Sequence, residues 1–180
     1  MQKILCIETA STNCSVALSN GEGVVAVKED YSLNFSHAER LHIFIQEILR
    51  ENNLALSNLD AIAISEGPGS YTGLRIGVSA AKGLCFSLDI PLIAVPTLAS
   101  LSHQVKEKVV VVPMMDARRM EVYTAVFNEQ QEQVEKTSAK ILEADSYSHL
   151  LEKGKVYFIG SGVEKFRNIC LARKCCLYRR

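Results

Sequence analysis

The chain has 180 residues, of which 48% are hydrophobic and 22% charged, an ordinary composition for a globular protein with one or two modest cores. Its 20 Lys and Arg side chains balance its 20 Asp and Glu side chains, so no net charge draws it to nucleic acid, and RNA would have to be held by a local patch or a partner. Neither a signal peptide nor an apolar run near the roughly 18 residues of a membrane helix is present, so a cytoplasmic protein is expected.

The N-terminal part of the chain predicts a β-meander followed by an amphipathic helix. Three short strands are expected, at residues 4–8, 14–19 and 23–28. Asn20-Gly21 supplies a hairpin turn between the last two. Between His37 and Glu51 apolar residues recur at helical spacing, and Ser36 is placed to cap this helix. Ile43 falls on the polar side of the helix, so its side chain is expected to point outward.

Strands and helices then alternate, which is typical of a sheet with parallel strands covered by helices. The next elements are expected at residues 61–65 (strand), 71–86 (helix), 92–95 (strand) and from Thr97 (helix). The remainder predicts strands at residues 109–115, 121–128 and 156–159 and a helix at residues 145–152.

The two halves of the sequence resemble each other. Residues 8–20 overlay residues 116–128 without a gap, and an acidic residue, Glu8 or Asp116, ends a buried strand in each. A later strand in each half runs into a Gly-x-Gly turn. Two copies of one structural unit are therefore predicted. The expected domains are residues 1–104 and 105–180.

The strongest local signal is the segment from Ser65 to Gly77, which lies between a predicted strand and a predicted helix. Backbone amides at the helix start could hold an anion such as a phosphate. The spacing, however, matches neither the dinucleotide fingerprint nor a Walker loop. A tight turn, in which Gly67 and Gly69 supply unusual φ values, is favoured over a nucleotide site.

The helix that follows carries a stripe of small residues at intervals of four: Gly73, Gly77, Ala81 and Cys85. Because each helical glycine costs about 1 kcal/mol relative to alanine, the stripe indicates a close approach of another backbone. The stripe packs either on the protein's own sheet, which is the commoner arrangement, or on a helix of another chain. Further apolar residues give this helix a second non-polar side, so both contacts can coexist.

The sequence specifies no catalytic residue and no metal site. His37 and His42 lie about 140° apart on one helix and do not readily share a metal. No Gly-x-Ser-x-Gly elbow and no zinc-type cysteine spacing occurs, and buried thiols are expected. At the strand ends a carboxylate could orient a metal or water, or could simply bond the adjacent turn. The candidates for cofactor binding are Glu8, Thr9, Gly67, Gly69 and Asp116.

Four stretches together carry a family resemblance: residues 4–10, 36–39, 67–77 and 116–123. They resemble the TsaB (YeaZ) family, and the likeness runs from Met1 to about Ile169. The resemblance implies a duplicated actin-like fold, of the acetate-and-sugar-kinase, Hsp70 and actin superfamily with its ribonuclease H-like units. Family members usually run further, and the ending at residues 172–180 is unlike theirs, so a second domain short of one element is expected.

The resemblance implies a non-catalytic subunit. It would bind and activate TsaD, the subunit that holds ATP and metal and transfers a threonylcarbamoyl group to the adenosine next to the tRNA anticodon. A TsaE-like ATPase would join the complex, tRNA would be reached only through it, and the chain would form a homodimer when the partner is absent. No cofactor and no membrane contact are expected for this chain.

The resemblance also implies that the helices at residues 37–51 and 71–86 form a helix-bundle interface with the partner. The expected contact positions are His37, Arg40, Ile43, Gly73, Leu74, Arg75, Gly77 and Ala81. Two enzymatic alternatives are a metal-dependent glycoprotease-like peptidase and a kinase-like ATP-binding enzyme. A third alternative is weak nucleotide binding in the cleft between the domains.

Overall fold

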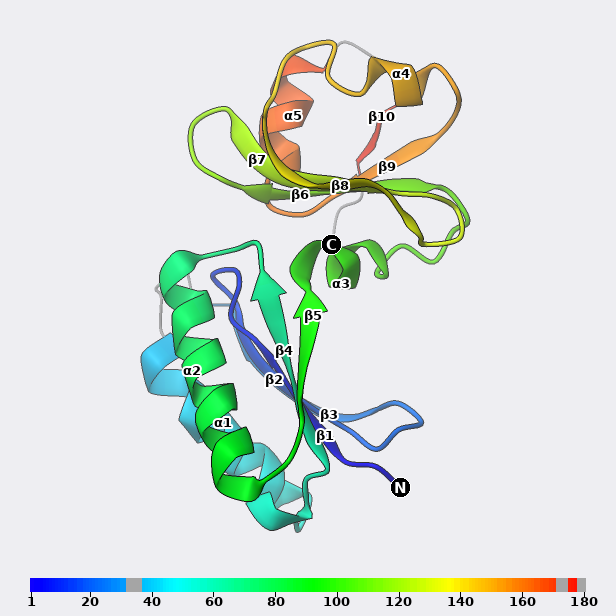
Figure 1. Ribbon diagram of the computed structural model, residues 1–180. Coiled ribbons are helices and arrows are strands. Elements are labelled where there is room, and N and C mark those ends of the chain that lie inside the picture. The colour runs from blue at the N-terminus through cyan, green and yellow to red at the C-terminus, as the bar shows by residue number, and fades with distance from the viewer. Residues whose placement is uncertain (32–36, 171–174, 178–180) are drawn as a thin grey trace. The chain divides into compact units, whose positions relative to one another are not determined.

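The computed structural model describes three stretches of the chain: residues 1–31, 37–170 and 175–177. They form two compact units, Met1–Pro96 and Thr97–Arg180 (Figure 1). A short helix, α3 (Thr97–Ser102), contacts strands of the second unit and belongs to it, whereas the sequence suggested a boundary after residue 104. Among the helices of the described stretches, none is both long and apolar enough to cross a membrane.

The first unit contains a five-stranded mixed sheet in the order β3-β2-β1-β4-β5. Its strands are β1 (Ile4–Glu8), β2 (Cys14–Ser19), β3 (Val24–Asp30), β4 (Ala61–Gly67) and β5 (Leu92–Pro96). β1, β2 and β3 form the predicted antiparallel meander, and β4 and β5 continue the sheet in parallel with β1. The helical elements are α1 (His37–Glu51), the 3-10 turn η1 (Leu56–Asn58) and α2 (Tyr71–Leu88). The alternation of strands and helices is confirmed. Ser36, the predicted cap of α1, lies outside the described residues.

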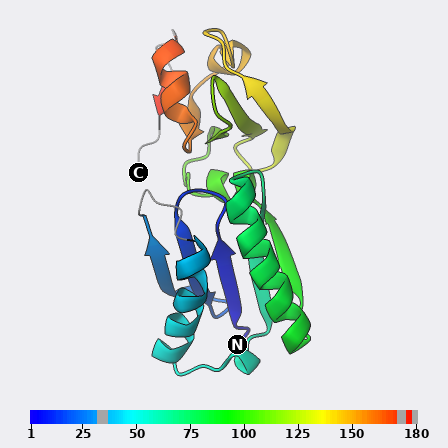
Figure 2. The same ribbon diagram turned by 90° about the vertical axis from the view of Figure 1, so that its left-hand side faces the viewer.

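One face of this sheet forms the core of the first unit together with α1 and α2, and Figure 2 shows both helices in front of the sheet. Alternate strand residues, such as Leu5 and Ile7, are buried there. They share a hydrophobic cluster with the apolar side of α1: Leu41, Phe44, Ile45 and Ile48. On the opposite side of α1, Ile43 is 43% exposed, which confirms its predicted outward position.

The opposite face of the sheet carries small and apolar side chains. Paired positions form a row across all five strands: Val27, Ala17, Cys6, Ala63 and Ile93. At the two edges Val27 is 49% exposed and Ile93 is 41% exposed. No helix among the described residues of this unit packs on this side (Figures 1 and 2). We call it the open face of the first sheet.

The second unit repeats the topology of the first. Its strands are β6 (Val110–Asp116), β7 (Glu121–Phe127), β8 (Gln133–Ile141), β9 (Val156–Ile159) and β10 (Cys175–Leu177). Their order, β10-β9-β6-β7-β8, places the parallel and antiparallel neighbours as in the first unit, which confirms the predicted duplication. The sequence did not predict β8, β10 or the helix α5 (Val163–Ile169). The helix expected at residues 145–152 is shorter, since α4 spans Ser148–Leu151.

Both faces of the second sheet are covered. On one face, Tyr147, Phe158 and Phe166 form an aromatic cluster with ring centroids 4.8 to 5.6 Å apart, and α4 and α5 lie over it. On the other face α3 packs on β6 and β7, where Val111 and Phe127 are buried (Figure 1). The second sheet is therefore sandwiched between helices.

The two units differ in the register of their first two strands. Glu8 pairs with Ser15 in the first unit, whereas Asp116 pairs with Val122 in the second. Paired residues of antiparallel strands point to the same face, and a slip of one residue reverses that face. Glu8 therefore points to the open face, while Asp116 shares the helix-covered face with the core residue Val122. The predicted ungapped alignment of the two halves gives the correct order of strands. It is wrong by one residue where it aligns β1 with β6, because Met115 rather than Asp116 takes the position of Glu8.

Candidate functional site

Glu8, at the end of β1, has both carboxylate oxygens engaged. The Ala10 amide donates to Oε1 at 2.6 Å, and the hydroxyl of Ser65 on the neighbouring strand β4 donates to Oε2. Ser65 is buried, so this bond ties two adjacent strands together at their carboxyl ends. The contacts fit the structural interpretation of Glu8, in which the carboxylate bonds the turn that follows it.

Thr9 explains the glycines of α2. A Cβ placed on Gly77 would overlap the Thr9 hydroxyl oxygen, and a Cβ on Gly73 would overlap its carbonyl oxygen. A Cβ on Gly69 would lie 2.6 Å from the Cβ of Ala10. The glycines are therefore needed because the end of β1 presses against the first turns of α2. Among the described residues, no group hydrogen-bonds the buried Thr9 hydroxyl.

Two amides near the start of α2 donate hydrogen bonds inside the unit. The Ser70 amide donates to the Ala10 carbonyl oxygen at 2.6 Å, and the Gly73 amide donates to the Ser70 hydroxyl at 3.2 Å. Gly67 has a φ of +116°, which only glycine adopts readily. These contacts account for the glycine segment as a turn that docks α2 on β1. An anion held by Gly67 or Gly69 remains a prediction.

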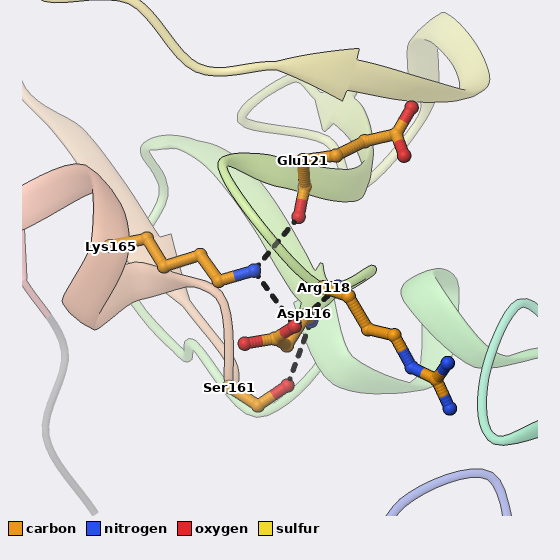
Figure 3. A network of polar contacts seen from close by, with 5 residues as sticks. All are labelled: Asp116, Arg118, Glu121, Ser161 and Lys165. Carbon is orange, nitrogen blue, oxygen red and sulfur yellow. Dashed lines mark hydrogen bonds and ion pairs between the residues drawn. The ribbon is translucent and has the colours of Figure 1, made fainter.

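In the second unit, Asp116 is the centre of a polar network (Figure 3). Lys165 of α5 donates to Asp116 Oδ1 at 2.8 Å and to the Glu121 carbonyl oxygen at 3.1 Å. The Arg118 amide donates to the same carboxylate oxygen at 2.6 Å, and the Asp116 amide donates to the Ser161 hydroxyl at 3.0 Å. The network joins the ends of β6 and β7 to α5.

Two opposing effects set the pKa of Asp116. Burial by itself raises the pKa, but the hydrogen bond and the charge of Lys165, together with the Arg118 amide, outweigh burial and hold the pKa below its usual value. The carboxylate is therefore ionised and is neutralised by its own unit. Any metal at Asp116 would have to compete with the Lys165 ammonium group, and a cofactor role for this residue remains a prediction.

The histidines of α1 lie in different surroundings. His37 is buried, with Nε2 2.9 Å from the Ser11 carbonyl oxygen, whereas His42 is exposed. Within the part of the chain that the structure describes, no three His, Cys, Asp or Glu side chains are grouped as metal ligands.

Several of the predicted interface positions are packed inside the first unit: His37, Gly73, Gly77 and Ala81. The small-residue stripe of α2 faces Thr9 and Ile64 of the unit's own sheet, which is the commoner of the two predicted arrangements. Buried groups offer no surface to a second chain. The structure therefore gives these four residues a role in internal packing, and their role as contacts with a partner stays a prediction.

The other predicted positions lie on the outer side of the helices. Arg40, Ile43 and Arg75 are exposed, and Leu74 is partly buried. α1 and α2 contact each other on the same face of the sheet, so their outer sides form one surface. We call it the helix face, made of Arg40, Ile43, Tyr71, Arg75, Lys82 and Phe86.

The sequence indicated a second apolar side of α2 that includes Phe86, but neither Phe86 nor Tyr71 was predicted as a contact position. Tyr71 is 74% exposed and Phe86 is 91% exposed. Their spacing relative to the buried glycines could have revealed them, because both fall on the side of α2 opposite the stripe. Lys165 was missed because α5 was not predicted, although apolar residues recur at helical spacing there: Val163, Phe166 and Ile169.

Comparison with known proteins agrees with this architecture. The pattern of the family described as "TsaD: tRNA N6-adenosine threonylcarbamoyltransferase" matches residues 32–175. The tRNA threonylcarbamoyladenosine biosynthesis protein TsaB of Bacillus subtilis is 35% identical over 161 residues, which cover 87% of this chain and 70% of that protein. Escherichia coli TsaB is 37% identical over 128 residues, 69% of this chain and 54% of that protein.

Among solved structures, YeaZ from Pseudomonas aeruginosa superposes with a TM-score of 0.82 at 29% identity, covering 99% of this chain and 84% of that one. The ethanolamine utilization protein EutJ from Carboxydothermus hydrogenoformans shares the fold, with a TM-score of 0.52 at 13% identity. The duplicated sheets and these neighbours define an actin-like α/β protein. At the level of sequence, the chain belongs to the TsaB family of tRNA threonylcarbamoyladenosine biosynthesis proteins.

Proposed function

We propose that this chain is a non-catalytic subunit in the synthesis of threonylcarbamoyladenosine in tRNA, and that it binds and activates a TsaD-like transferase. The observation that carries the proposal is its similarity to B. subtilis TsaB over 87% of the chain. A transferase of Bacillus thuringiensis, named tRNA N6-adenosine threonylcarbamoyltransferase, is also 37% identical over 111 residues. That second similarity supports a pairing between two related subunits.

The strand-end carboxylates fit a non-catalytic role. Glu8 is bonded by Ser65 and a backbone amide, and Asp116 is paired with Lys165. Each carboxylate thus serves the packing of its own unit. In this proposal ATP and metal are held by the TsaD-like partner, a TsaE-like ATPase joins the assembly, and tRNA is reached through the complex in the cytoplasm.

The helix face is the proposed docking surface for the partner. It exposes Ile43 of α1 and Tyr71 and Phe86 of α2, and exposed apolar and aromatic side chains grouped on one surface are typical of protein interfaces. The same surface would mediate a homodimer when the partner is absent.

Reconstitution tests the proposed function. The chain is mixed with TsaD-like and TsaE-like subunits, the adenylate-forming enzyme and unmodified tRNA, and the modified nucleoside is measured by mass spectrometry. We expect modification only when the chain is present and no turnover by the chain alone. Hydrolysis of a peptide or phosphorylation of a sugar by the isolated chain would favour the peptidase or the kinase alternative instead.

A matched pair of variants tests the docking surface. Ile43 on the helix face and Ile93 on the open face are similarly exposed, at 43% and 41%. We expect Ile43→Arg to weaken binding to the TsaD-like partner by about tenfold or more, because a charge would be buried in the interface, and Ile93→Arg to leave it nearly unchanged. Equal effects of the two variants in a calorimetric titration would contradict the assignment.

A further inference from the structure

The outer side of α2 combines aromatic and cationic side chains in one stripe. Tyr71, Arg75, Lys82 and Phe86 follow one another at spacings of four, seven and four residues, so they lie within about 60° of one another around the helix axis. All four are exposed, and Phe86 at 91% is the most exposed large apolar side chain of the described residues. The stripe places two cations between two aromatic rings.

The cations of this stripe have no acidic partner. α2 contains no Asp or Glu between Tyr71 and Leu88. Neither Arg75 nor Lys82 forms an ion pair with any described residue. In α1, by contrast, Arg40 lies 3.6 Å from Asp30, and two glutamates accept the ammonium group of Lys28. Ion pairs thus engage Arg40, Glu47 and Glu51 of α1, whereas neither cation of α2 takes part in one among the described residues.

Arg75 is also held in place. Its guanidinium group lies over the ring of Tyr71, 5.3 Å from the ring centroid, with Nη1 3.5 Å from the phenol oxygen. Stacking on an aromatic ring limits the rotamers of an arginine and leaves its outward N–H groups free for a planar acceptor. Carboxylates match this geometry by accepting two parallel hydrogen bonds.

We infer that the TsaD-like partner presents an acidic surface to this stripe, with a carboxylate for Arg75, a second for Lys82 and apolar sockets for Tyr71 and Phe86. The inference rests on the proposed function and adds the chemistry of the partner's side. It follows from charge complementarity, because desolvating two unpaired cations against a neutral surface would cost affinity.

The same charges make a second copy of the chain a weaker occupant than an acidic partner. A two-fold pairing of α2 with α2 would bring the cationic stripe against itself, since symmetric dimers contact through the same patch on both chains. Like charges repel, and the repulsion is strongest at low salt. The stripe therefore favours an acidic partner, and a homodimer on the helix face, formed when that partner is absent, is the weaker of the two complexes.

Affinity for the purified TsaD-like subunit, measured by calorimetry at low and high salt, tests the inference. For the natural chain we expect the affinity to fall by about tenfold between roughly 0.05 M and 0.5 M NaCl, because salt screens opposite charges. The double variant Arg75→Glu/Lys82→Glu should bind about thirtyfold more weakly at low salt and should gain affinity as salt rises. Self-association of the natural chain, followed by light scattering, should increase with salt.

A control variant, Lys106→Glu/Lys153→Glu, changes the net charge equally at exposed positions of the second unit and should bind normally. If charge reversal impairs folding, as judged by circular dichroism, the neutral pair Arg75→Gln/Lys82→Gln should still lose most of the salt dependence. Tight binding that neither salt nor these variants alter would overturn the inference while leaving the proposed function intact. Failure of the natural chain to bind the partner at any salt would instead count against the proposed function.

Discussion

The two units share one topology but cover their sheets differently. In the first unit α1 and α2 lie on one face and the other face is open, whereas helices flank the second sheet on both faces. The strand-end acids differ accordingly, since Glu8 points to the open face and Asp116 points to α5. Duplication thus preserved strand order while a one-residue register difference gave the two carboxylates different surroundings.

The largest effect on stability is expected when a buried phenylalanine, rather than an exposed one, is replaced by alanine. Phe166 is fully buried in the aromatic cluster of the second unit, whereas Phe86 is 91% exposed on the first. Phe166→Ala should lower the free energy of unfolding by about 3–5 kcal/mol, because it leaves a cavity. Phe86→Ala should change it by less than about 0.5 kcal/mol. Urea denaturation measures both, and comparable losses would contradict the placement of these rings.

A pair of glycines on α2 tests how closely the first unit packs. Gly77→Ala should cost about 1–3 kcal/mol, since its Cβ meets the Thr9 hydroxyl and lies 3.1 Å from Ile64 Cδ1. Gly83 has no atom within 4 Å of its Cβ position, so Gly83→Ala should stabilise the protein by up to about 1 kcal/mol. Opposite shifts in the denaturation midpoint are expected. A stabilising Gly77→Ala would show that α2 does not press on β1.

The ion pair between Asp116 and Lys165 in the second unit should make stability depend on pH. The pKa of Asp116 is lowered in the folded state, so its pairing with Lys165 stabilises the protein above the unfolded pKa of about 4, and this contribution is lost as the pH falls through the folded pKa. Lys165→Met should cost about 0.5–1 kcal/mol near pH 7, because solvent screens this half-exposed pair. The free energy of unfolding, measured by urea denaturation at several values between pH 3 and pH 7, should then depend less on pH in the variant. An unchanged profile would show that the pair adds no stability.

The smallest effect concerns thiol reactivity on the two sides of the first sheet. Cys6 lies on the open face, whereas Cys14 of β2 and Cys85 of α2 are buried between the sheet and the helices. Burial raises the pKa of all three thiols, that of Cys14 to about 11, so alkylation should be slow at neutral pH and faster as the pH rises. Cys6 should react about tenfold faster than the other two, as measured by peptide mass spectrometry. Equal rates would mean that the open face is covered in solution.

Much of the fold followed from local sequence patterns. The helical spacing of apolar residues placed α1 at its observed bounds, and the alternation of strands and helices predicted the parallel part of each sheet. β8 was missed because its nine residues are almost all exposed and carry no alternating apolar pattern. α5 was missed because it is only seven residues long.

The candidate site could be predicted only in part. The sequence singled out Glu8, Asp116 and the glycines of α2, because their residue types and spacing are local signals. It could not decide which face each carboxylate points to, because that depends on strand register. Nor could it pair Asp116 with Lys165, 49 residues away along the chain.

The sequence by itself determined the elements, the duplication and the need for close packing along α2, since these depend on neighbours within a few turns of the chain. Only the tertiary structure decided that Gly73 and Gly77 meet Thr9, and that the aromatic and cationic side of α2 remains exposed. The physical reason is that burial and charge pairing are set by contacts between segments far apart in the chain, which no local pattern encodes.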